Sequence, residues 1–362
     1  MSIIIMETKL IFTNLVGEAL DSLANSLGNP QAAVIADVNT AQFVLPLLHK
    51  DSRTAAAATL ITVRAGEDAK SIEELSRVWR QLDRAGMTRS SLIINLGGGV
   101  VTDLGGFAAA TFKRGIRFVN IPTSVLGAVD ASYGGKTGIN FDGAKNQIGV
   151  FADPEATIIS SIYFNTLTTT QILSGYAEML KHALLDSRGT LDRLLAFSPV
   201  YPQFDSERML PLIEASSEVK RKVVSEDPRE TGPRKVLNLG HTVGHAIESL
   251  ALSRQSAVAH GYAVAWGCVT ALILSHLELG FPSDILHKFA DYVLTNFGAW
   301  PLTCDDYPAL LEYMRKDKKN KGDGKISFTL LTDVGQAQTD CACSEERIEA
   351  ALDIYRDLMH LP

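Results

Sequence analysis

Five short apolar runs constrain the fold of the first half of this 362-residue chain more than any other feature. They cover residues 32–39, 58–66, 91–99, 116–123 and 156–160, and their length and composition are typical of buried strands. Between two of them, residues 71–86 carry apolar side chains at helical spacing. Strands that alternate with helices predict a parallel sheet with helices on its faces, so we expect an α/β fold here.

The second half follows a different pattern. Long helical patterns dominate at residues 170–185, 209–225, 239–252, 262–279 and 344–359, and residues 325–332 form the one expected strand. A chain of this length is expected to form two domains. We therefore predict an α/β domain over residues 1–165 and a mostly α-helical domain over residues 166–362.

Composition narrows the class of protein. A net charge of −7 and a pI of about 5.7 argue against non-specific binding of nucleic acid, although local lysines and arginines can still bind a small anion. The four cysteines show no C-x-x-C spacing, which predicts neither a disulfide framework nor a structural zinc site. The sequence has neither a signal-peptide pattern nor an apolar run of transmembrane length. We expect a cytoplasmic protein that binds no membrane.

Three consecutive glycines, Gly97, Gly98 and Gly99, lie between an expected strand and a helix of small residues. Glycines let the backbone approach a diphosphate closely, and the N-terminus of the following helix favours anions. The spacing is not G-x-G-x-x-G, because the next glycines are Gly105 and Gly106. The alternative is a tight turn that binds no ligand.

The segment 122–151 is unusually rich in glycine and also carries Asp130, Lys136, Lys145 and Asn146. One interpretation is a backbone that wraps closely around a polar ligand, with the lysines contacting an anion. The alternative is a glycine-rich β-hairpin whose lysines are solvated. The residues alone leave both open.

The stretch "VLNLGHTVGHAIESL" places His241 and His245 on one helical face, and Glu248 extends the same stripe. A third histidine, His260, begins the next helical pattern. Isolated core histidines are usually hydrogen-bonded packing residues. Three histidines within 20 residues, with a carboxylate available, instead indicate a catalytic zinc site that keeps a position open for water or substrate.

A carboxylate, Glu178, lies with Lys181 on a narrow polar stripe of an otherwise apolar helix. A buried unpaired charge is costly, so Glu178 is either a metal ligand beside a cation or half of an ion pair in a half-exposed groove. Upstream of His241, the polar residues Lys220, Arg234 and Asn238 either face the same site or belong to a solvated segment.

Six motifs together resemble a known family. "GGGVVTDLGGF", "IPTS…VDASYGGKTGIN", "GAKNQIG", "GYAEMLKHAL", "KVVSEDPRETGPRKVLNLGHTVGHAIE" and "HGYAVAWG" occur in the order typical of 3-dehydroquinate synthases, which are sugar-phosphate cyclases. The resemblance implies an N-terminal NAD-binding α/β domain and a C-terminal helical metal-binding domain. It also implies conversion of 3-deoxy-D-arabino-heptulosonate 7-phosphate to 3-dehydroquinate and phosphate, an early step of the shikimate pathway. NAD is reduced and then regenerated in that reaction, and the metal is zinc or cobalt.

The resemblance also implies functions for individual residues of this sequence. It implies that Glu178, His241 and His260 bind the metal. The residues expected to contact NAD are Asp37, Glu67, Lys70, Gly98, Gly99, Asp103, Thr123, Ser124, Lys145 and Thr166. The residues expected to contact the substrate are Asp130, Lys136, Asn146, Lys181, Lys220, Arg234, Asn238, His245 and one of Lys318 and Lys319. Arg114 is expected to reach the site of a neighbouring subunit, which implies a homodimer.

Three alternatives remain. Other cyclases of the group, such as 2-deoxy-scyllo-inosose and 2-epi-5-epi-valiolone synthases, act on substrates that lack the carboxylate, and Arg234, Asn238 and His245 argue against them. A metal-dependent alcohol dehydrogenase of related fold would consume NAD stoichiometrically. The third alternative is a catalytically inactive binding protein, and the complete set of polar residues argues against it.

Overall fold

The structure is a computed structural model, and it describes residues 9–142, 144–227, 232–316 and 326–362. Two compact units are present: unit 1 contains Met1–Thr168 and Asp205–Ser217, and unit 2 contains Thr169–Phe204 and Glu218–Pro362. The predicted division at residues 165 and 166 remains a prediction. Lys318 and Lys319 lie outside the described residues.

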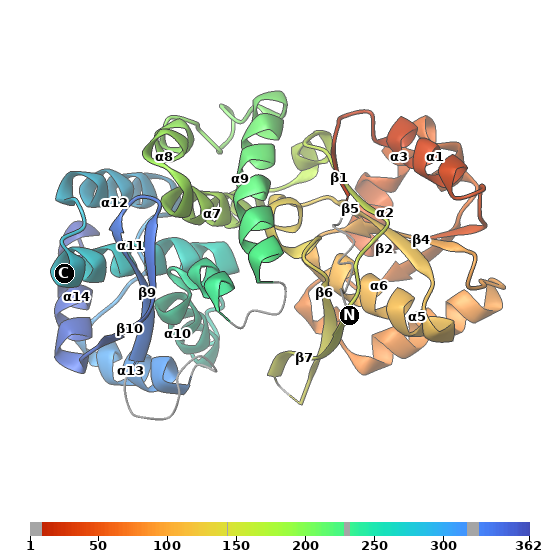
Figure 1. The fold of residues 1–362 in the computed structure, drawn as a ribbon. Helices are drawn as coiled ribbons and strands as arrows, with labels where there is room; N and C mark the ends of the chain where they lie inside the picture. The colour runs from red at the N-terminus through yellow and green to blue at the C-terminus, as the bar shows by residue number, and fades with distance from the viewer. Residues whose placement is uncertain (1–8, 143, 228–231, 317–325) are drawn as a thin grey trace. The chain divides into compact units, whose positions relative to one another are not determined.

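Unit 1 is built on a six-stranded parallel sheet in the order β1-β8-β5-β4-β2-β3 (Figure 1). The strands are β1 (Leu10–Phe12), β2 (Ala32–Asp37), β3 (Thr59–Val63), β4 (Leu92–Gly97), β5 (Arg117–Pro122) and β8 (Ala156–Ile159). All five strands predicted in this half are confirmed, and so is the α/β fold class. Strand β1 was not predicted, because three residues are too short to show a period.

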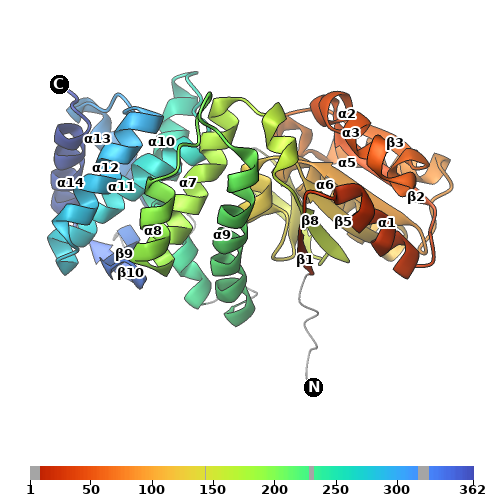
Figure 2. The ribbon, with the colours of Figure 1, turned by 90° about the horizontal axis from the view of Figure 1, so that it is seen from above.

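Helices cover both faces of this sheet (Figures 1 and 2). On one face lie α1 (Val16–Ser26), α3 (Leu45–Asp51) and α4 (Arg53–Ala56), and on the other lie α5 (Ile72–Arg84) and α6 (Gly99–Thr111). Successive residues of a strand point to opposite faces, so Val34 packs with the first group of helices and Ile35 with the second. Burial on both faces explains why these strands are continuously apolar.

The strand order reverses between β2 and β4. The chain runs from β2 outward to β3 at the edge, and then returns to the other side of β2 to form β4 and β5. In open α/β sheets, ligands bind outside the carboxyl ends of the strands at such a reversal. The short helix α2 (Val38–Phe43) follows β2 directly, and α6 follows β4. The fold therefore marks the ends of β2 and β4 as a ligand site.

The glycine-rich segment forms a π-helical turn, η3 (Gly127–Ala131), followed by an antiparallel hairpin of β6 (Lys136–Phe141) and β7 (Ala144–Phe151). The hairpin considered as an alternative is thus the conformation adopted, and both Lys136 and Lys145 are exposed on it. An exposed lysine is accessible both to water and to an anionic ligand. The predicted ligand contacts of Lys136 and Lys145 therefore stay predictions. Shorter 3₁₀ turns in unit 1 are η1 (Glu67–Ala69), η2 (Phe112–Arg114) and η4 (Ile162–Thr166).

Unit 2 is mostly helical, as predicted. Its helices are α7 (Thr169–Asp186), α8 (Arg188–Leu195), α10 (His241–Ser253), α11 (His260–Leu279), α12 (Ser283–Phe297), α13 (Tyr307–Lys316) and α14 (Glu345–Leu358), with 3₁₀ turns η5 (Pro233–Asn238) and η6 (Cys304–Asp306). Helix α9 (Ser206–Glu226) belongs to unit 1 up to Ser217 and to unit 2 beyond it. Strand β9 (Ile326–Asp333) pairs antiparallel with β10 (Gln336–Cys343), which was not predicted.

Helix α11 is the central helix of unit 2 and packs against α7, α10, α12, α14 and β9. By length and composition it is apolar enough to cross a membrane, but most of it is buried inside the protein. Its apolar character is therefore that of a core helix. All four cysteines are free thiols.

We predict that Gly105→Ala destabilises unit 1. A β-carbon on Gly105 of α6 would lie 2.0 Å from Oδ1 of Asn95 on β4, and that side chain is held in place because its amide donates to Asn120. Overpacking of this kind costs about 1–3 kcal/mol. The measurement is the free energy of unfolding in urea. Gly189→Ala is the control, because a β-carbon there meets nothing within 4 Å and alanine favours helix α8. Equal stability of the two variants would contradict the packing argument.

Candidate active site

Most of the residues predicted to contact NAD lie at the carboxyl edge of the unit 1 sheet. Asp37 ends β2, while Gly98 and Gly99 connect β4 to α6. The others follow the remaining strands: Glu67 and Lys70 after β3, Thr123 and Ser124 after β5, and Thr166 after β8. Asp103 lies in α6 and Lys145 in β7. This is the edge at which the strand order marks a ligand site.

The glycines at this edge leave no room for side chains. A β-carbon on Gly98 would lie 3.1 Å from the Ser124 hydroxyl, and one on Gly99 would lie 2.9 Å from the β-carbon of Ala131. Gly98 caps α6 without a side-chain hydrogen bond. No side chain of Gly98 or Gly99 therefore covers the backbone at the start of this 13-residue helix, where N–H groups and the helix dipole favour a phosphate. Asp37 in contrast caps α2, accepting hydrogen bonds from the N–H groups of Asn39 and Thr40 through one oxygen.

A network of charged and amide side chains lies beside the glycine turn. The buried Lys70 places Nζ 2.7 Å from Oδ2 of Asp103 and also contacts the Asn146 amide oxygen. Burial raises the pKa of Asp103 to about 6, against the opposing charge of Lys70 and with the help of Glu67 and Asp130. Asp103, predicted to contact NAD, and Asn146, predicted to contact the substrate, therefore share the ammonium group of Lys70.

Asn140 ties this network together and was not predicted. Its Nδ2 donates to Oε1 of Glu67 at 2.9 Å, its Oδ1 accepts from the N–H of Asn146 at 2.8 Å, and its own N–H donates to the Lys70 carbonyl at 2.8 Å. Asn146 has a φ of 53°, a conformation that its hydrogen bond to Asn140 supports. The sequence motif "GIN" contains Asn140, but no local pattern shows that it bridges two segments 73 residues apart.

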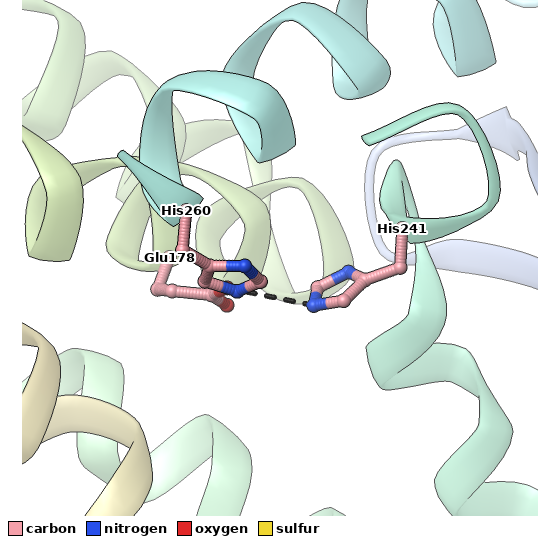
Figure 3. Close-up of side chains that lie close together, drawn as sticks. All are labelled: Glu178, His241 and His260. Carbon is pink, nitrogen blue, oxygen red and sulfur yellow. Dashed lines mark ion pairs between the residues drawn. The ribbon is translucent and has the colours of Figure 1, made fainter. Parts of the chain in front are cut away.

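In unit 2, three helices bring Glu178, His241 and His260 together (Figure 3). Glu178 lies in α7, His241 begins α10 and His260 begins α11. The Nε2 atom of His260 is 3.3 Å from Oε1 of Glu178, and the Nε2 atom of His241 is 3.6 Å from the same oxygen. Two ligands of a tetrahedral zinc ion at bond lengths of about 2.0 Å are about 3.3 Å apart. The separations therefore fit a divalent ion without rearrangement of the helices.

In both His241 and His260, the second ring nitrogen lies at hydrogen-bond distance from an oxygen acceptor. The Nδ1 atom of His241 lies 3.1 Å from the Leu239 carbonyl oxygen, and the Nδ1 atom of His260 lies 3.2 Å from Oε2 of Glu248. Metal-bound histidines almost always donate their other N–H to a carbonyl or a carboxylate in this way. Glu178 itself is fully buried, and neither of its oxygens accepts a hydrogen bond of normal geometry from any described residue. The donor set thus fits a metal ion.

The charge on Glu178 is balanced within unit 2. The ammonium of Lys181, also buried, forms an ion pair with Oε2 of Glu178. Burial alone would raise the pKa of Glu178, but Lys181 and the two imidazoles hold it well below its usual range. Burial would lower the pKa of His260, but the nearby carboxylates of Glu178 and Glu248 raise it to about 10 as long as no metal ion is bound. The expected Glu178–Lys181 pair exists, but it is buried rather than in a half-exposed groove.

Glycines allow the helices to approach closely enough for this cluster. A β-carbon on Gly261 would lie 1.9 Å from the carbonyl oxygen of Ser174, one turn before Glu178. The Gly261 N–H also donates to the Ser174 hydroxyl at 3.1 Å. A β-carbon on Gly267 would lie 2.1 Å from the carbonyl oxygen of Gly240, which sets the distance between α11 and α10. The glycines next to the histidines are therefore packing residues.

The other predicted substrate contacts of unit 2 that the structure describes belong to α9, η5 and α10. The His245 ring is 5.3 Å from that of His241, between centroids. Arg234 is buried in η5, and its backbone N–H donates to Asp227 at 3.3 Å. Asn238 ends η5, directly before the two-residue turn into α10, and Lys220 is buried in α9.

The remaining predicted substrate contacts belong to unit 1. Asp130 lies in the π-helical turn η3, a type of turn often found at functional sites. Lys136 begins β6, and Asn146 belongs to the Lys70 network. Arg114 is exposed at the end of η2, where it and Lys113 both adopt positive φ. These positions are consistent with ligand binding, and the individual roles remain predictions.

Solved structures of sugar-phosphate cyclases share this fold. The 2-epi-5-epi-valiolone synthase of Streptomyces hygroscopicus subsp. jinggangensis, solved with NAD⁺ and Zn²⁺ bound, is similar with a TM-score of 0.84 at 23% identity, and the match covers 99% of both chains. A 2-deoxy-scyllo-inosose synthase, solved with carbaglucose-6-phosphate, NAD⁺ and Co²⁺, is similar with a TM-score of 0.80 at 22% identity over 95% of both chains. Fold and site thus define a protein of the sugar-phosphate cyclase fold.

Sequence comparison identifies the family. Residues 60–174 match the N-terminal model of 3-dehydroquinate synthase, and residues 175–320 match the C-terminal model. The 3-dehydroquinate synthase of Parabacteroides distasonis is 41% identical over 351 residues, which cover 97% of this chain and 98% of that protein. The chain belongs to the 3-dehydroquinate synthase family, as the motifs predicted, and it is an enzyme.

We predict that Gly261→Ala weakens divalent metal binding. The added methyl group collides with a backbone carbonyl of α7, so α11 must shift and carry His260 away from Glu178. A strain of about 1–3 kcal/mol that is relieved by this shift corresponds to a loss of affinity of about tenfold or more. Competition with a chromophoric zinc chelator measures the affinity, and Gly189→Ala in the same unit is again the control. Unchanged affinity in a folded Gly261→Ala variant would contradict this account.

Proposed function

We propose that this chain is a 3-dehydroquinate synthase, which converts 3-deoxy-D-arabino-heptulosonate 7-phosphate to 3-dehydroquinate and phosphate with NAD and a divalent metal. The observation that carries the proposal is the meeting of Glu178, His241 and His260 in a chain that is similar to 3-dehydroquinate synthases over nearly its whole length. The solved cyclases with NAD⁺ and with Zn²⁺ or Co²⁺ support the choice of cofactors.

We infer that Glu178, His241 and His260 hold zinc or cobalt. A bound divalent ion supplies Lewis-acid polarisation of substrate oxygens. The three side chains offer one carboxylate and two neutral nitrogens, which leaves positions for water or substrate. Lys181 keeps Glu178 ionised, and the Leu239 carbonyl lies at hydrogen-bond distance from Nδ1 of His241.

We infer that NAD binds at the carboxyl edge of the unit 1 sheet. Bound NAD supplies a hydride acceptor that is regenerated within the same catalytic cycle. The bare backbone at Gly98 and Gly99 suits its diphosphate, and the hydroxyls of Thr123 and Ser124 follow on the neighbouring strand. Asp37 at the end of β2 offers a carboxylate oxygen that does not cap α2, which suits a ribose hydroxyl.

The polar residues predicted from the sequence to contact the substrate are proposed to bind it. The substrate carries a carboxylate and a phosphate, so cations are expected to orient it and to keep one conformer for the successive steps. The proposed residues are Lys181, Lys220, Arg234, Asn238 and His245 in unit 2, and Asp130, Lys136 and Asn146 in unit 1. Lys318 and Lys319 remain candidates from the sequence. Cyclases whose substrates lack the carboxylate have no equivalent use for Arg234.

The assembly and the cellular location are proposed in the same way. We infer a homodimer in which Arg114 reaches the partner's site. The exposure of Arg114 supports this, as does the turn that presents it, in which Lys113 anchors the backbone through Nζ to the Met87 carbonyl. Free thiols and a net charge of −7 suit a cytoplasmic enzyme that binds neither nucleic acid nor membrane.

We predict that the protein releases phosphate from 3-deoxy-D-arabino-heptulosonate 7-phosphate and that a chelator abolishes this release. Phosphate is measured colorimetrically, before and after treatment with chelator and after zinc or cobalt is added back. Absorbance of NADH is followed in the same reaction and should not accumulate, because NAD is regenerated. Stoichiometric NADH would instead indicate an alcohol dehydrogenase. Phosphate release that resists the chelator, in a protein verified as metal-free, would contradict the proposed role of the metal.

We predict that Arg234→Ala raises the KM for the carboxylated substrate about tenfold to a hundredfold, with a smaller effect on kcat. A lost hydrogen bond between charged groups costs about 1.5–3 kcal/mol, which corresponds to that range. Steady-state kinetics of phosphate release provides the measurement. The matched control is Lys235→Ala, because the neighbouring Lys235 instead forms an ion pair with Asp340. Equal KM values for Arg234→Ala and the unmutated enzyme would contradict the proposal that Arg234 binds the substrate.

A further inference from the structure

Glu248 contacts the metal cluster of unit 2 from outside it. His260 uses its two ring nitrogens in two directions: Nε2 lies 3.3 Å from Oε1 of Glu178, and Nδ1 lies 3.2 Å from Oε2 of Glu248. Glu248 is in α10, two turns after His241, so the helix that supplies one histidine also reaches the other. The sequence places Glu248 on the same helical stripe as His241 and His245, but the pattern alone assigns no function to its carboxylate.

We propose that Glu248 is a positioning residue that fixes the tautomer and the ring orientation of His260. Its carboxylate accepts the Nδ1–H of His260, which leaves the lone pair of Nε2 directed at the position shared with Glu178 and His241. The Leu239 carbonyl holds Nδ1 of His241 in the equivalent manner. The inference rests on the proposed metal site and adds a residue outside the ligand set.

A direct ligand role for Glu248 is the competing interpretation. His245, Glu248 and His260 also offer one atom each within 4.8 Å of one another. The two nitrogens of an imidazole point away from each other, however, so an ion bound between Glu248 and Nδ1 would not be the ion bound at Nε2. Glu178 is fully buried beside Nε2, whereas Glu248 is partly exposed. The buried carboxylate has the greater need of a cation.

His260 needs this second anchor because of where it lies in the fold. It is the first residue of α11, and the preceding Ala259 provides no side-chain cap. The backbone there is fixed against α7 through Gly261 and Ser174, but this contact leaves the imidazole ring free to rotate about its side-chain torsions. A hydrogen bond to Glu248 removes that freedom. The backbone of His260 is thus positioned by α7 and its ring by α10.

The test compares Glu248→Ala with Glu248→Gln. Zinc affinity of the purified protein is measured by competition with a chromophoric chelator, and the cobalt-substituted protein is followed by its visible absorption. Loss of an outer-shell partner lowers metal affinity about 10- to 100-fold, which is expected for Glu248→Ala. Glu248→Gln keeps an oxygen that can accept the Nδ1–H, so it should bind zinc more tightly than Glu248→Ala. The control is Glu278→Ala at the far end of α11, where the carboxylate pairs with Arg347.

The outcomes separate this inference from the proposed function. If the unmutated protein binds neither zinc nor cobalt, the proposed metal site fails. If it binds zinc and Glu248→Ala binds it equally well, the positioning role is wrong and the metal site stands. Equal losses in Glu248→Ala and Glu248→Gln would also overturn the hydrogen-bond argument. Should Glu248→Ala not fold, Glu248→Asp replaces it, because its shorter carboxylate cannot reach Nδ1 and should weaken zinc binding relative to Glu248→Gln.

Discussion

The structure of unit 2 depends on one carboxylate that water cannot reach. Glu178 lies in the middle of an apolar helix and is completely buried, and a buried charge is tolerated only when cations and hydrogen-bond donors surround it. Lys181 supplies one cation from the next turn of the same helix. From two other helices, His241 at the start of α10 and His260 at the start of α11 bring their Nε2 atoms to 3.6 Å and 3.3 Å from Oε1 of Glu178. Helices α7, α10 and α11 thus converge on one buried carboxylate.

Packing and polar chemistry are coupled through small residues. A buried cluster works only if its members are held at hydrogen-bond distance, so helices α7, α10 and α11 must approach more closely than ordinary side chains allow. Gly261 gives α11 backbone contact with α7, and Gly267 gives it backbone contact with α10. The glycines of unit 1 serve a related purpose at Gly105, where α6 meets Asn95, and at Gly98, where the proposed NAD site needs close approach to the backbone. The same residue type thus positions side chains in unit 2 and exposes main chain in unit 1.

The sequence was sufficient for features that local patterns encode. The parallel strands were predicted because burial on both faces makes them apolar throughout. The helical spacing of the histidines indicated a metal site, but the set of Glu178, His241 and His260 came from the resemblance to 3-dehydroquinate synthases and not from a local pattern. Strand β10 was not predicted because it is mostly polar and carries no apolar run that would indicate a buried strand. The partners of Asn140 and of Glu248 could not be predicted, because their hydrogen bonds join segments that only the tertiary fold brings together. Long-range contacts of this kind leave no period in the sequence.

Specificity must reside in a small part of this framework. Cyclases only 22–23% identical to this chain keep the whole fold, so the sheet and the helices cannot by themselves decide which substrate is used. Arg234 lies in η5, a short turn between α9 and α10, and Asp227 holds its backbone. A turn can exchange its side chains without moving the helix that carries His241. With the role proposed for Arg234, recognition of the substrate carboxylate is separable from metal binding, because the two functions belong to different segments of unit 2.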